Sequence, residues 1–337
     1  MKMTIKDIAK LAGVSTTTVS KVMNGKDESI SDATKDRIKK IMKENNYTPS
    51  VVARSLVTKR TNTIGLIIPD IRNPFFPELA RGAEDMASKA GYTIIFCNAD
   101  NNLSKEDEYL KVLSEKMVDG IIIAVSSKRE DQFEKITETS MPIILVDRDI
   151  DIDMKCIKGR VITDNFKGAC IGVEHMISNG MEKILFISGP LTNKASFERL
   201  EGYKSALENH NIDFDQDLLL EGEFNENWGY EAAAIAIEKN LDFDGVFCGN
   251  DLIAIGAIKS FKGKGIRIPQ DISIVGFDDI YVSSMIEPEL TTIRQPKYEM
   301  GYRAVEMLID ILEGKKAEQK RLVLQPDIVI RESVKKK

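Results

Sequence analysis

Polar and aromatic residues follow several short apolar runs of this sequence, where they could bind a small ligand. The first run, TIGLIIP, is followed by RNPFFP, which carries Asn73, Phe75 and Phe76. Positions of the same kind, after this run and later ones, hold Asp70, Asp147, Arg148, Asn250, Asp251, Phe277, Asp278 and Asp279. Carboxylate, guanidinium and amide groups each make paired hydrogen bonds to adjacent hydroxyls, while rings can lie against C–H faces. The mixture favours a neutral polyol as the ligand.

A structural role is the alternative for some of these residues. Aspartate and asparagine after a strand often begin the next helix as caps, which is the role we expect for Asp70 and Asp251. The two phenylalanines are harder to explain in this way. On an extended chain, adjacent side chains point in opposite directions, so burying both Phe75 and Phe76 in one core would be difficult.

The elements that would position these residues form an α/β body. From residue 62 onward, apolar strand-like runs alternate with amphipathic helical segments. We expect strands at 63–68, 92–97, 119–125, 142–146, 160–163, 183–188, 217–222, 244–248 and 272–276. This alternation predicts two parallel sheets covered on both faces, and ligands of such sheets sit beyond the carboxyl ends of the strands. The late segments TTIRQP and RLVLQPDIVI indicate that the chain crosses back between the sheets near its end.

The first sixty residues differ from the body in charge. They contain 13 lysines and arginines against 6 aspartates and glutamates, a net charge of +7, whereas the whole chain carries −6. The remaining 277 residues therefore carry −13. A basic module on an acidic body predicts a polyanionic partner for that module alone.

The segment TIKDIAKLAGVSTTTVSKVMNG predicts two short helices around Gly13, and Ser31 to about Asn45 predicts a third. Together they form a helix-turn-helix unit, in which Ala33 and Ile38 of the third helix face inward. The exposed start of the second helix carries Thr16, Thr17, Ser20 and Lys21. Such residues reach base edges in a major groove, although a solvated helix face would have a similar pattern.

The stretch YTPSVVARSL, followed by a basic linker, predicts one further short helix that needs a partner to fold. Ala53, Arg54 and Leu56 are suited to a minor groove, where the leucine would act as an apolar wedge between base steps. An ordinary linker is the alternative.

These segments, together with TNTIGLIIPDIRNPFF, resemble the lactose/galactose-repressor (LacI/GalR) family of bacterial transcription factors, and the likeness runs from Thr4 to about Ser333. The resemblance implies a dimer that binds operator DNA and inserts a hinge leucine at the operator centre. It implies DNA contacts by Thr4, Ser15, Thr16, Thr17, Thr18, Lys21, Asn24, Ala53, Arg54 and Leu56. The best-known members have larger residues at the Thr16 and Thr17 positions and arginine at the Lys21 position, so their operator sequence does not carry over.

The body resembles the periplasmic sugar-binding fold that this family shares. The motifs NPFF, VDR, ERLEGY, GND, GFDD and QP are similar to ligand positions of ribose-binding members. Carried over by position, they imply the effector ligands Asn73, Phe75, Phe76, Asp147, Arg148, Arg199, Phe224, Asn250, Phe277, Asp278 and Gln295. Pro69 departs from the pattern, because ribose binders tend to have a small hydroxyl residue there. D-ribose or a similar monosaccharide is the expected effector.

The expected organisation is a headpiece at 1–48, a hinge helix and linker at 49–61, and two subdomains. The N-terminal subdomain would contain 62–162 and 292–322, and the C-terminal subdomain 163–291 and 323–334.

Two other kinds of regulator are alternatives to a sugar-controlled repressor: a catabolite-control regulator with a phosphorylated carrier protein as corepressor, and a purine-responsive repressor. An enzyme is not expected, since G-x-G-x-x-G after a strand, the P-loop motif and G-x-S-x-G are all absent from the sequence.

Composition limits the remaining classes. The four cysteines and two histidines lack metal-ligand spacing, so we expect buried free thiols, no metal and no cofactor beyond the sugar effector. No apolar run reaches the roughly 18 residues of a membrane span, and the N-terminus lacks a signal-peptide core, which predicts a cytoplasmic protein. The C-terminal IRESVKKK adds no heptads, which favours a homodimer over a tetramer.

Overall fold

The computed structural model describes residues 3–23, 25, 27–47, 60–126, 141–150, 155–315 and 320–337. The chain divides into two compact units, with the boundary between Thr61 and Asn62. The first unit is helical, and the second consists of two α/β subdomains, each built on a largely parallel sheet. The fold class predicted from the sequence is therefore confirmed. No helix in the described ranges is long and apolar enough to span a bilayer.

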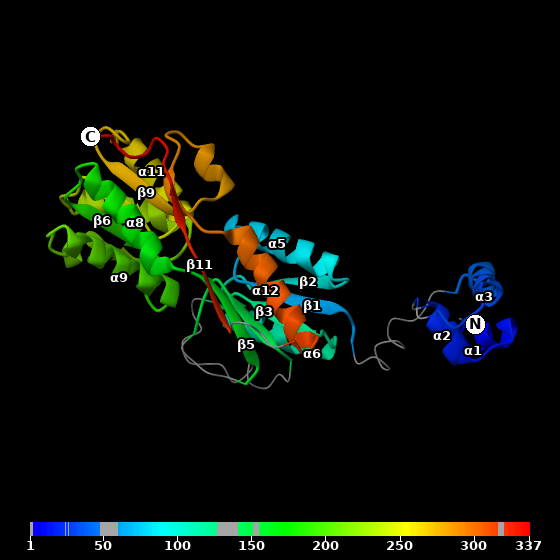
Figure 1. Cartoon of the computed structure of the whole chain (residues 1–337). Helices are drawn as coiled ribbons and strands as arrows, with labels where there is room; N and C mark the ends of the chain where they lie inside the picture. Colours follow the sequence, from blue (N-terminus) through cyan, green and yellow to red (C-terminus); the bar gives the residue numbers. More distant parts are fainter. Residues whose placement is uncertain are drawn as a thin grey trace. The chain divides into compact units, whose positions relative to one another are not determined.

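The first unit has three helices in its described part, packed around one small apolar core (Figure 1). They are α1 (Ile5–Ala12), α2 (Thr16–Met23) and α3 (Asp32–Glu44). Gly13 ends α1 with a left-handed backbone, which glycine adopts without strain. Ile8, Val19 and Ile38 are fully buried between the helices. Ala33 is exposed, contrary to the prediction, because it precedes Ile38 by five positions and so lies about 140° away around the helix.

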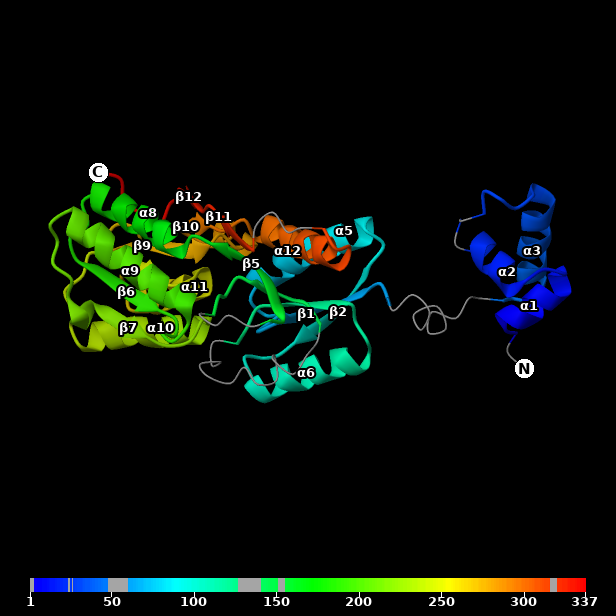
Figure 2. The same ribbon diagram turned by 60° about the horizontal axis from the view of Figure 1, so that its bottom comes forward.

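The N-terminal subdomain contains a six-stranded sheet whose paired strands all run parallel in the described ranges. In spatial order the strands are β11 (Arg321–Leu324), β5 (Ile157–Thr163), β4 (Ile143–Val146), β3 (Gly120–Ile123), β1 (Thr63–Ile68) and β2 (Thr93–Asn98). Helices α5 (Phe75–Lys89) and α12 (Lys297–Leu312) cover one face, and α6 (Leu103–Glu115) covers the other (Figure 2). Strands β3 and β4 are buried along their whole length, which explains their uninterrupted apolar sequences.

Helices α5 and α12 pack at very short range. A Cβ atom at Gly82 would lie 1.9 Å from the carbonyl oxygen of Tyr298, and one at Gly301 would lie 1.9 Å from that of Leu79. The two glycines therefore allow the backbones to touch. This contact fixes the start of α12 against the helix that begins with the phenylalanine pair.

The C-terminal subdomain contains the second six-stranded sheet among the described residues. Its strands, in spatial order, are β12 (Asp327–Val329), β10 (Thr291–Arg294), β9 (Ser273–Asp278), β8 (Gly245–Cys248), β6 (Ile184–Ser188) and β7 (Leu219–Glu221). Only the edge strand β12 pairs antiparallel within these ranges. Helices α8 (Asn165–Ser178) and α9 (Lys194–Asn209) lie on one face, with α10 (Glu226–Glu238) and α11 (Asp251–Gly263) on the other. The 3-10 helices η1 (Gln216–Leu218) and η2 (Tyr281–Ser284) precede β7 and β10.

The strand pairing moves the expected subdomain boundaries by one to three residues. Strand β5 ends at Thr163 rather than 162. Strand β10 pairs with β9 and β12, so residues 292–294 belong to the C-terminal sheet and the crossing falls near Gln295. Strand β11 pairs with β5 as far as Leu324, so 323–324 belong to the N-terminal sheet. Apolar runs predict strands but do not reveal which sheet a strand joins.

Candidate functional site

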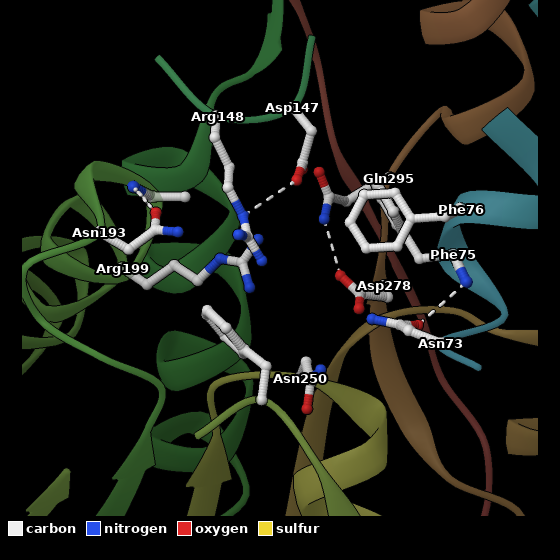
Figure 3. Close-up of a pocket in the computed structure, with 12 residues that line it drawn as sticks. Asn73, Phe75, Phe76, Asp147, Arg148, Asn193, Arg199, Asn250, Asp278 and Gln295 are labelled. Atoms are coloured by element: carbon white, nitrogen blue, oxygen red, sulfur yellow. Dashed lines mark hydrogen bonds and ion pairs between the residues drawn. The ribbon is translucent and has the colours of Figure 1, made fainter. Parts of the chain in front are cut away.

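A small cavity lies between the two subdomains, at the carboxyl ends of several strands (Figure 3). Its lining consists of Asn73, Phe75, Phe76, Asp147, Arg148, Asn193, Ala195, Arg199, Phe224, Asn250, Asp278 and Gln295. Ten of these residues belong to the eleven effector ligands expected from the sequence. Phe277 is the exception, and Asn193 and Ala195 are additional. The structure thus brings together residues that are more than 200 positions apart in the chain.

The phenylalanine pair lies in the first turn of α5 and not on extended chain. Asn73 positions this turn, because its side-chain oxygen accepts a hydrogen bond of 3.0 Å from the backbone nitrogen of Phe75. The rings of Phe75 and Phe76 meet edge to face, with centroids 5.0 Å apart and an interplanar angle of 84°. Both side chains are buried in the core of the N-terminal subdomain while also lining the cavity. The expectation that both side chains could not easily be buried in one core is therefore wrong. Adjacent side chains point in opposite directions on a strand, but they point in more similar directions on a helix.

Asp147 and Arg148 follow β4 and carry opposite charges into the cavity. The Arg148 Nε lies 3.7 Å from the Asp147 Oδ2, and both side chains are about nine-tenths buried. Arg148 also donates from Nη1 to the carbonyl oxygen of Val125 at 3.0 Å, which fixes its guanidinium. Burial raises the pKa of Asp147, and the neighbouring guanidinium groups of Arg148 and Arg199 oppose that rise.

Arg199 projects from α9 and is held by three contacts. Its Nε donates to the Asn165 Oδ1 at 2.9 Å, and its Nη1 donates to the Gly249 carbonyl at 2.6 Å. The guanidinium lies 3.7 Å from the ring centroid of Phe277. Phe277 is fully buried beneath it and is not part of the cavity lining, so its expected role as a direct ligand is corrected. Successive side chains of β9 alternate between faces, which turns Phe277 toward α8 and Asp278 toward the cavity.

Asp278 and Gln295 form the wall contributed by β9 and the segment after β10. The Gln295 Nε2 donates to the Asp278 Oδ1 at 2.7 Å. Within the described chain, the buried Gln295 Oε1 has no hydrogen-bond partner. A buried acceptor without a partner is costly, so a ligand hydroxyl that donates to it would be favoured. Burial raises the pKa of Asp278 to about 7, against the opposing effect of Arg199.

Two asparagines line the cavity and also cap helices. The Asn250 side chain accepts from the Ile253 nitrogen at 2.9 Å and starts α11. The Asn193 side chain accepts from the Ala195 nitrogen at 2.9 Å and starts α9. In each case the amide nitrogen is the group that remains to donate toward a ligand. The Phe224 ring completes this side, with the Arg148 and Arg199 guanidinium carbons 5.8 and 5.9 Å from its centroid.

Three of the aspartates after strands have structural roles. The expected helix cap at Asp70 is wrong, because the N-cap position of α5 is Pro74; Asp70 instead accepts hydrogen bonds from the backbone and side chain of Arg72 in the turn after β1. Asp279 pairs with Arg294 and Arg331. The expected cap at Asp251 is wrong in detail, because Asn250 caps the helix. The fully buried Asp251 carboxylate instead accepts from Ile280, Ser283 and Thr292, and so anchors the loop after β9.

Sequence reasoning missed Asn193 and Ala195, although the same rule could have found them. They follow β6, and the carboxyl end of that strand was not included among the expected ligand positions.

The described residues contain no group of three or more histidine, cysteine, aspartate or glutamate side chains arranged to hold a metal ion. The cysteines are free thiols, of which Cys97, Cys156 and Cys248 are buried and Cys170 is half-buried.

The headpiece presents the expected polar residues at the start of α2. Thr16, Thr17 and Lys21 are exposed. Ser15 caps α2 by accepting from the Thr18 nitrogen at 3.1 Å, and the two hydroxyls are 2.9 Å apart. Thr4 is exposed at the start of α1 and forms a capping box with Asp7. The expected DNA contacts Asn24, Ala53, Arg54 and Leu56, and the hinge helix, lie outside the described residues.

Two family models match the chain. Residues 4–50 match "Bacterial regulatory proteins, lacI family", and residues 61–333 match "Periplasmic binding proteins and sugar binding domain of LacI family". The chain is 40% identical over 335 residues to the HTH-type transcriptional regulator RegA of Clostridium saccharobutylicum, with 99% of both chains covered. It is 38% identical to the repressor PurR of Aliivibrio salmonicida, covering 99% of both, and 37% identical to the ribose operon repressor of Halalkalibacterium halodurans, covering 98% and 97%.

Solved structures share the fold over most of the chain. The lac repressor dimer bound to operator and the anti-inducer ONPF matches with a TM-score of 0.85 and 26% identity, covering 99% of both chains. A LacI family regulator from Enterococcus faecium with bound ribose matches with a TM-score of 0.72 and 33% identity, covering 82% of this chain and 99% of that one.

Proposed function

Because the chain belongs to the LacI family of bacterial regulatory proteins, we propose that it is a repressor whose operator affinity is controlled by D-ribose or a similar monosaccharide bound in the cavity between its subdomains. One observation carries the choice of ligand. Two guanidinium groups and two carboxyl groups line one small cavity with phenylalanine rings and carboxamides.

The charges of the cavity favour a neutral ligand with many hydroxyl groups. With both carboxyls ionised, Asp147 and Asp278 balance the charges of Arg148 and Arg199. Hydroxyls both donate and accept, so they can satisfy the carboxylates, the guanidinium groups and the free Gln295 acceptor together. A sugar phosphate would bring two negative charges beside the two carboxylates, which is unfavourable.

The relatives and the aromatic rings also bear on the choice of ligand. Similarity to a ribose operon repressor and to a structure that holds ribose supports the pentose. Similarity to PurR proteins makes a purine the second candidate. The rings of Phe75 and Phe76 are nearly perpendicular, so a flat base could stack on only one of them.

We further propose that the protein acts as a homodimer on double-stranded operator DNA. Two basic headpieces would bind two half-sites, with Lys21 and the helix N-termini near phosphates and Thr16 and Thr17 near bases. Sugar binding would close the cleft and shift the hinges, which would lower operator affinity. A coupling free energy of about 1–3 kcal/mol corresponds to a change of roughly 5–150-fold. The lac repressor dimer on its operator supports this arrangement.

A thermal-shift screen of the full chain tests the ligand. D-ribose, a hexose, ribose 5-phosphate and hypoxanthine would be compared at the same excess, since a bound ligand raises the melting temperature. We expect the largest shift with D-ribose. A shift with hypoxanthine alone would assign the second candidate. In a gel-shift assay at fixed salt, operator affinity that does not respond to the ligand would contradict the proposed control.

The effector affinity should depend on pH through Asp278. In the free protein, burial and the nearby Asp251 and Asp147 carboxyls raise its pKa to about 7, while Arg199 and Gln295 oppose that rise. Sugar hydroxyls donate best to the ionised form, so binding favours loss of the proton. Affinity should therefore level off above about pH 8 and fall toward tenfold per unit well below pH 7, giving about tenfold weaker binding at pH 6 than at pH 8. Calorimetry at both values measures this ratio. Equal affinities would show that Asp278 does not accept from the ligand in its ionised form.

A further inference from the structure

Lys297 is a buried lysine that lies beside the cavity but does not line it. It is the first residue of α12, and its side chain is 3% exposed. Its Nζ donates to the backbone carbonyls of Asp278 and Asp279, each at 2.8 Å, and lies 3.4 Å from the Glu78 Oε2. An ammonium group has three donors, so these contacts account for all of them.

The two carbonyls that bind Lys297 belong to an unusual stretch of backbone. Asp278 has φ 118° and Asp279 has φ 54°, values that residues other than glycine adopt rarely and with strain. In this conformation both carbonyl oxygens point at the same ammonium. Without that cation, the buried Asp278 carbonyl and the partly buried Asp279 carbonyl would both lose this donor, so the ammonium stabilises the strained form.

The strained backbone decides where two carboxylates point. The side chain of Asp278 faces the cavity and accepts from Gln295, whereas the side chain of Asp279 pairs with Arg294 and Arg331 away from it. A relaxed backbone at 278 would change the direction of the Asp278 carboxylate.

Lys297 also connects the two subdomains. It belongs to α12, which packs on α5 of the N-terminal subdomain, and Glu78 lies in the first turn of α5 beside the phenylalanine pair. Asp278 and Asp279 end strand β9 of the C-terminal subdomain. The lysine therefore links the loop that carries Asp278 to the helices that carry the opposite wall of the cavity.

We propose that Lys297 is a positioning residue for the effector: its ammonium holds the backbone at 278–279 so that the Asp278 carboxylate faces the ligand across the closed cleft. The inference rests on the proposed function, because it requires that the cavity binds the effector. Lys297 does not touch the ligand and acts through Asp278.

The test compares Lys297→Met with the unmodified full chain by calorimetry with D-ribose at pH 6 and pH 8. Methionine keeps much of the apolar stem and removes the ammonium. At pH 8 we expect at least tenfold weaker binding. We also expect the tenfold ratio between the two pH values to approach one, because a carboxylate that turns toward solvent regains an ordinary pKa. Unchanged affinity would overturn the proposal. Weaker binding with an unchanged ratio between the affinities at the two pH values would also overturn it, because that is the result expected if Lys297 only stabilised the fold.

Lys262→Met is the matched control, since Lys262 is an exposed lysine of the C-terminal subdomain that likewise donates to a backbone carbonyl, that of Glu287, at 2.9 Å. It should bind D-ribose like the unmodified chain. If circular dichroism shows that Lys297→Met does not fold, Lys297→Gln replaces it, since glutamine keeps N–H donors without the charge. Its affinity at pH 8 and its ratio between the two pH values are judged in the same way. Failure of the unmodified chain to bind D-ribose would reject the proposed ligand instead. The affinities of the variants would then be measured for the ligand that the thermal-shift screen identifies.

Discussion

Replacing Arg199 by lysine should weaken effector binding by at least about 100-fold and leave operator affinity without effector nearly unchanged. The guanidinium donates to Asn165 and Gly249 while its plane lies over the Phe277 ring. A single ammonium cannot reproduce this planar, forked arrangement, so one buried acceptor would lose its donor and the charge would leave the cavity wall. A lost hydrogen bond from a charged group costs about 1.5–3 kcal/mol, and 100-fold in affinity corresponds to about 2.7 kcal/mol.

Tryptophan fluorescence offers a simple measurement of this loss. Trp228 is the only tryptophan of the chain, and its indole nitrogen donates to the Ser188 carbonyl at 3.0 Å, near the Phe224 side of the cavity. Arg267→Lys is the control, because Arg267 is exposed and pairs only locally with Asp271 among the described contacts. If Arg199→Lys binds the effector within threefold of the unmodified chain, the guanidinium does not contribute to the site as we propose.

The strand-end residues of the site could be predicted from the sequence because the topology leaves little choice. Once β4, β8 and β9 are identified as parallel strands, their carboxyl ends converge, and Asp147, Asn250 and Asp278 follow. Arg199 could not be found in this way, because it lies more than a full helical turn inside α9. Phe224 follows the end of β7 by three residues, so the rule applies to it as it does to Asn193, but only the resemblance to a family pointed to it.

Three features are not evident from the apolar pattern, one for a local reason and two because of long-range contacts. The helical state of Phe75 and Phe76 is a local matter, because Asn73 and Pro74 determine where α5 begins. The sheet that β10 joins depends on pairing with β9. The strained backbone at Asp278 exists because Lys297, 19 positions away, supplies a cation for its carbonyl. In the last two cases tertiary contacts override local preference.

The second large effect should be seen on DNA. Leu56→Ala should weaken binding to the operator by at least about tenfold while changing binding to non-specific DNA by less than about twofold. Non-specific binding arises from the charge of the headpiece, which is +7 over residues 1–60 and is not altered by this substitution. Specific binding would additionally require an apolar side chain to open a base step at the operator centre, and alanine is too short to replace it.

The operator for this measurement would be selected from a random DNA pool with the unmodified chain, and both DNAs would be titrated at the same salt concentration. Leu56→Met is the matched control, because methionine keeps a long apolar side chain and should retain operator affinity within about threefold. Equal losses on operator and non-specific DNA would contradict the wedge, since they would indicate that Leu56 supports the headpiece as a whole. A loss confined to the operator would indicate that the hinge recognises the operator centre. A change in hinge spacing caused by a bound sugar could then release the DNA.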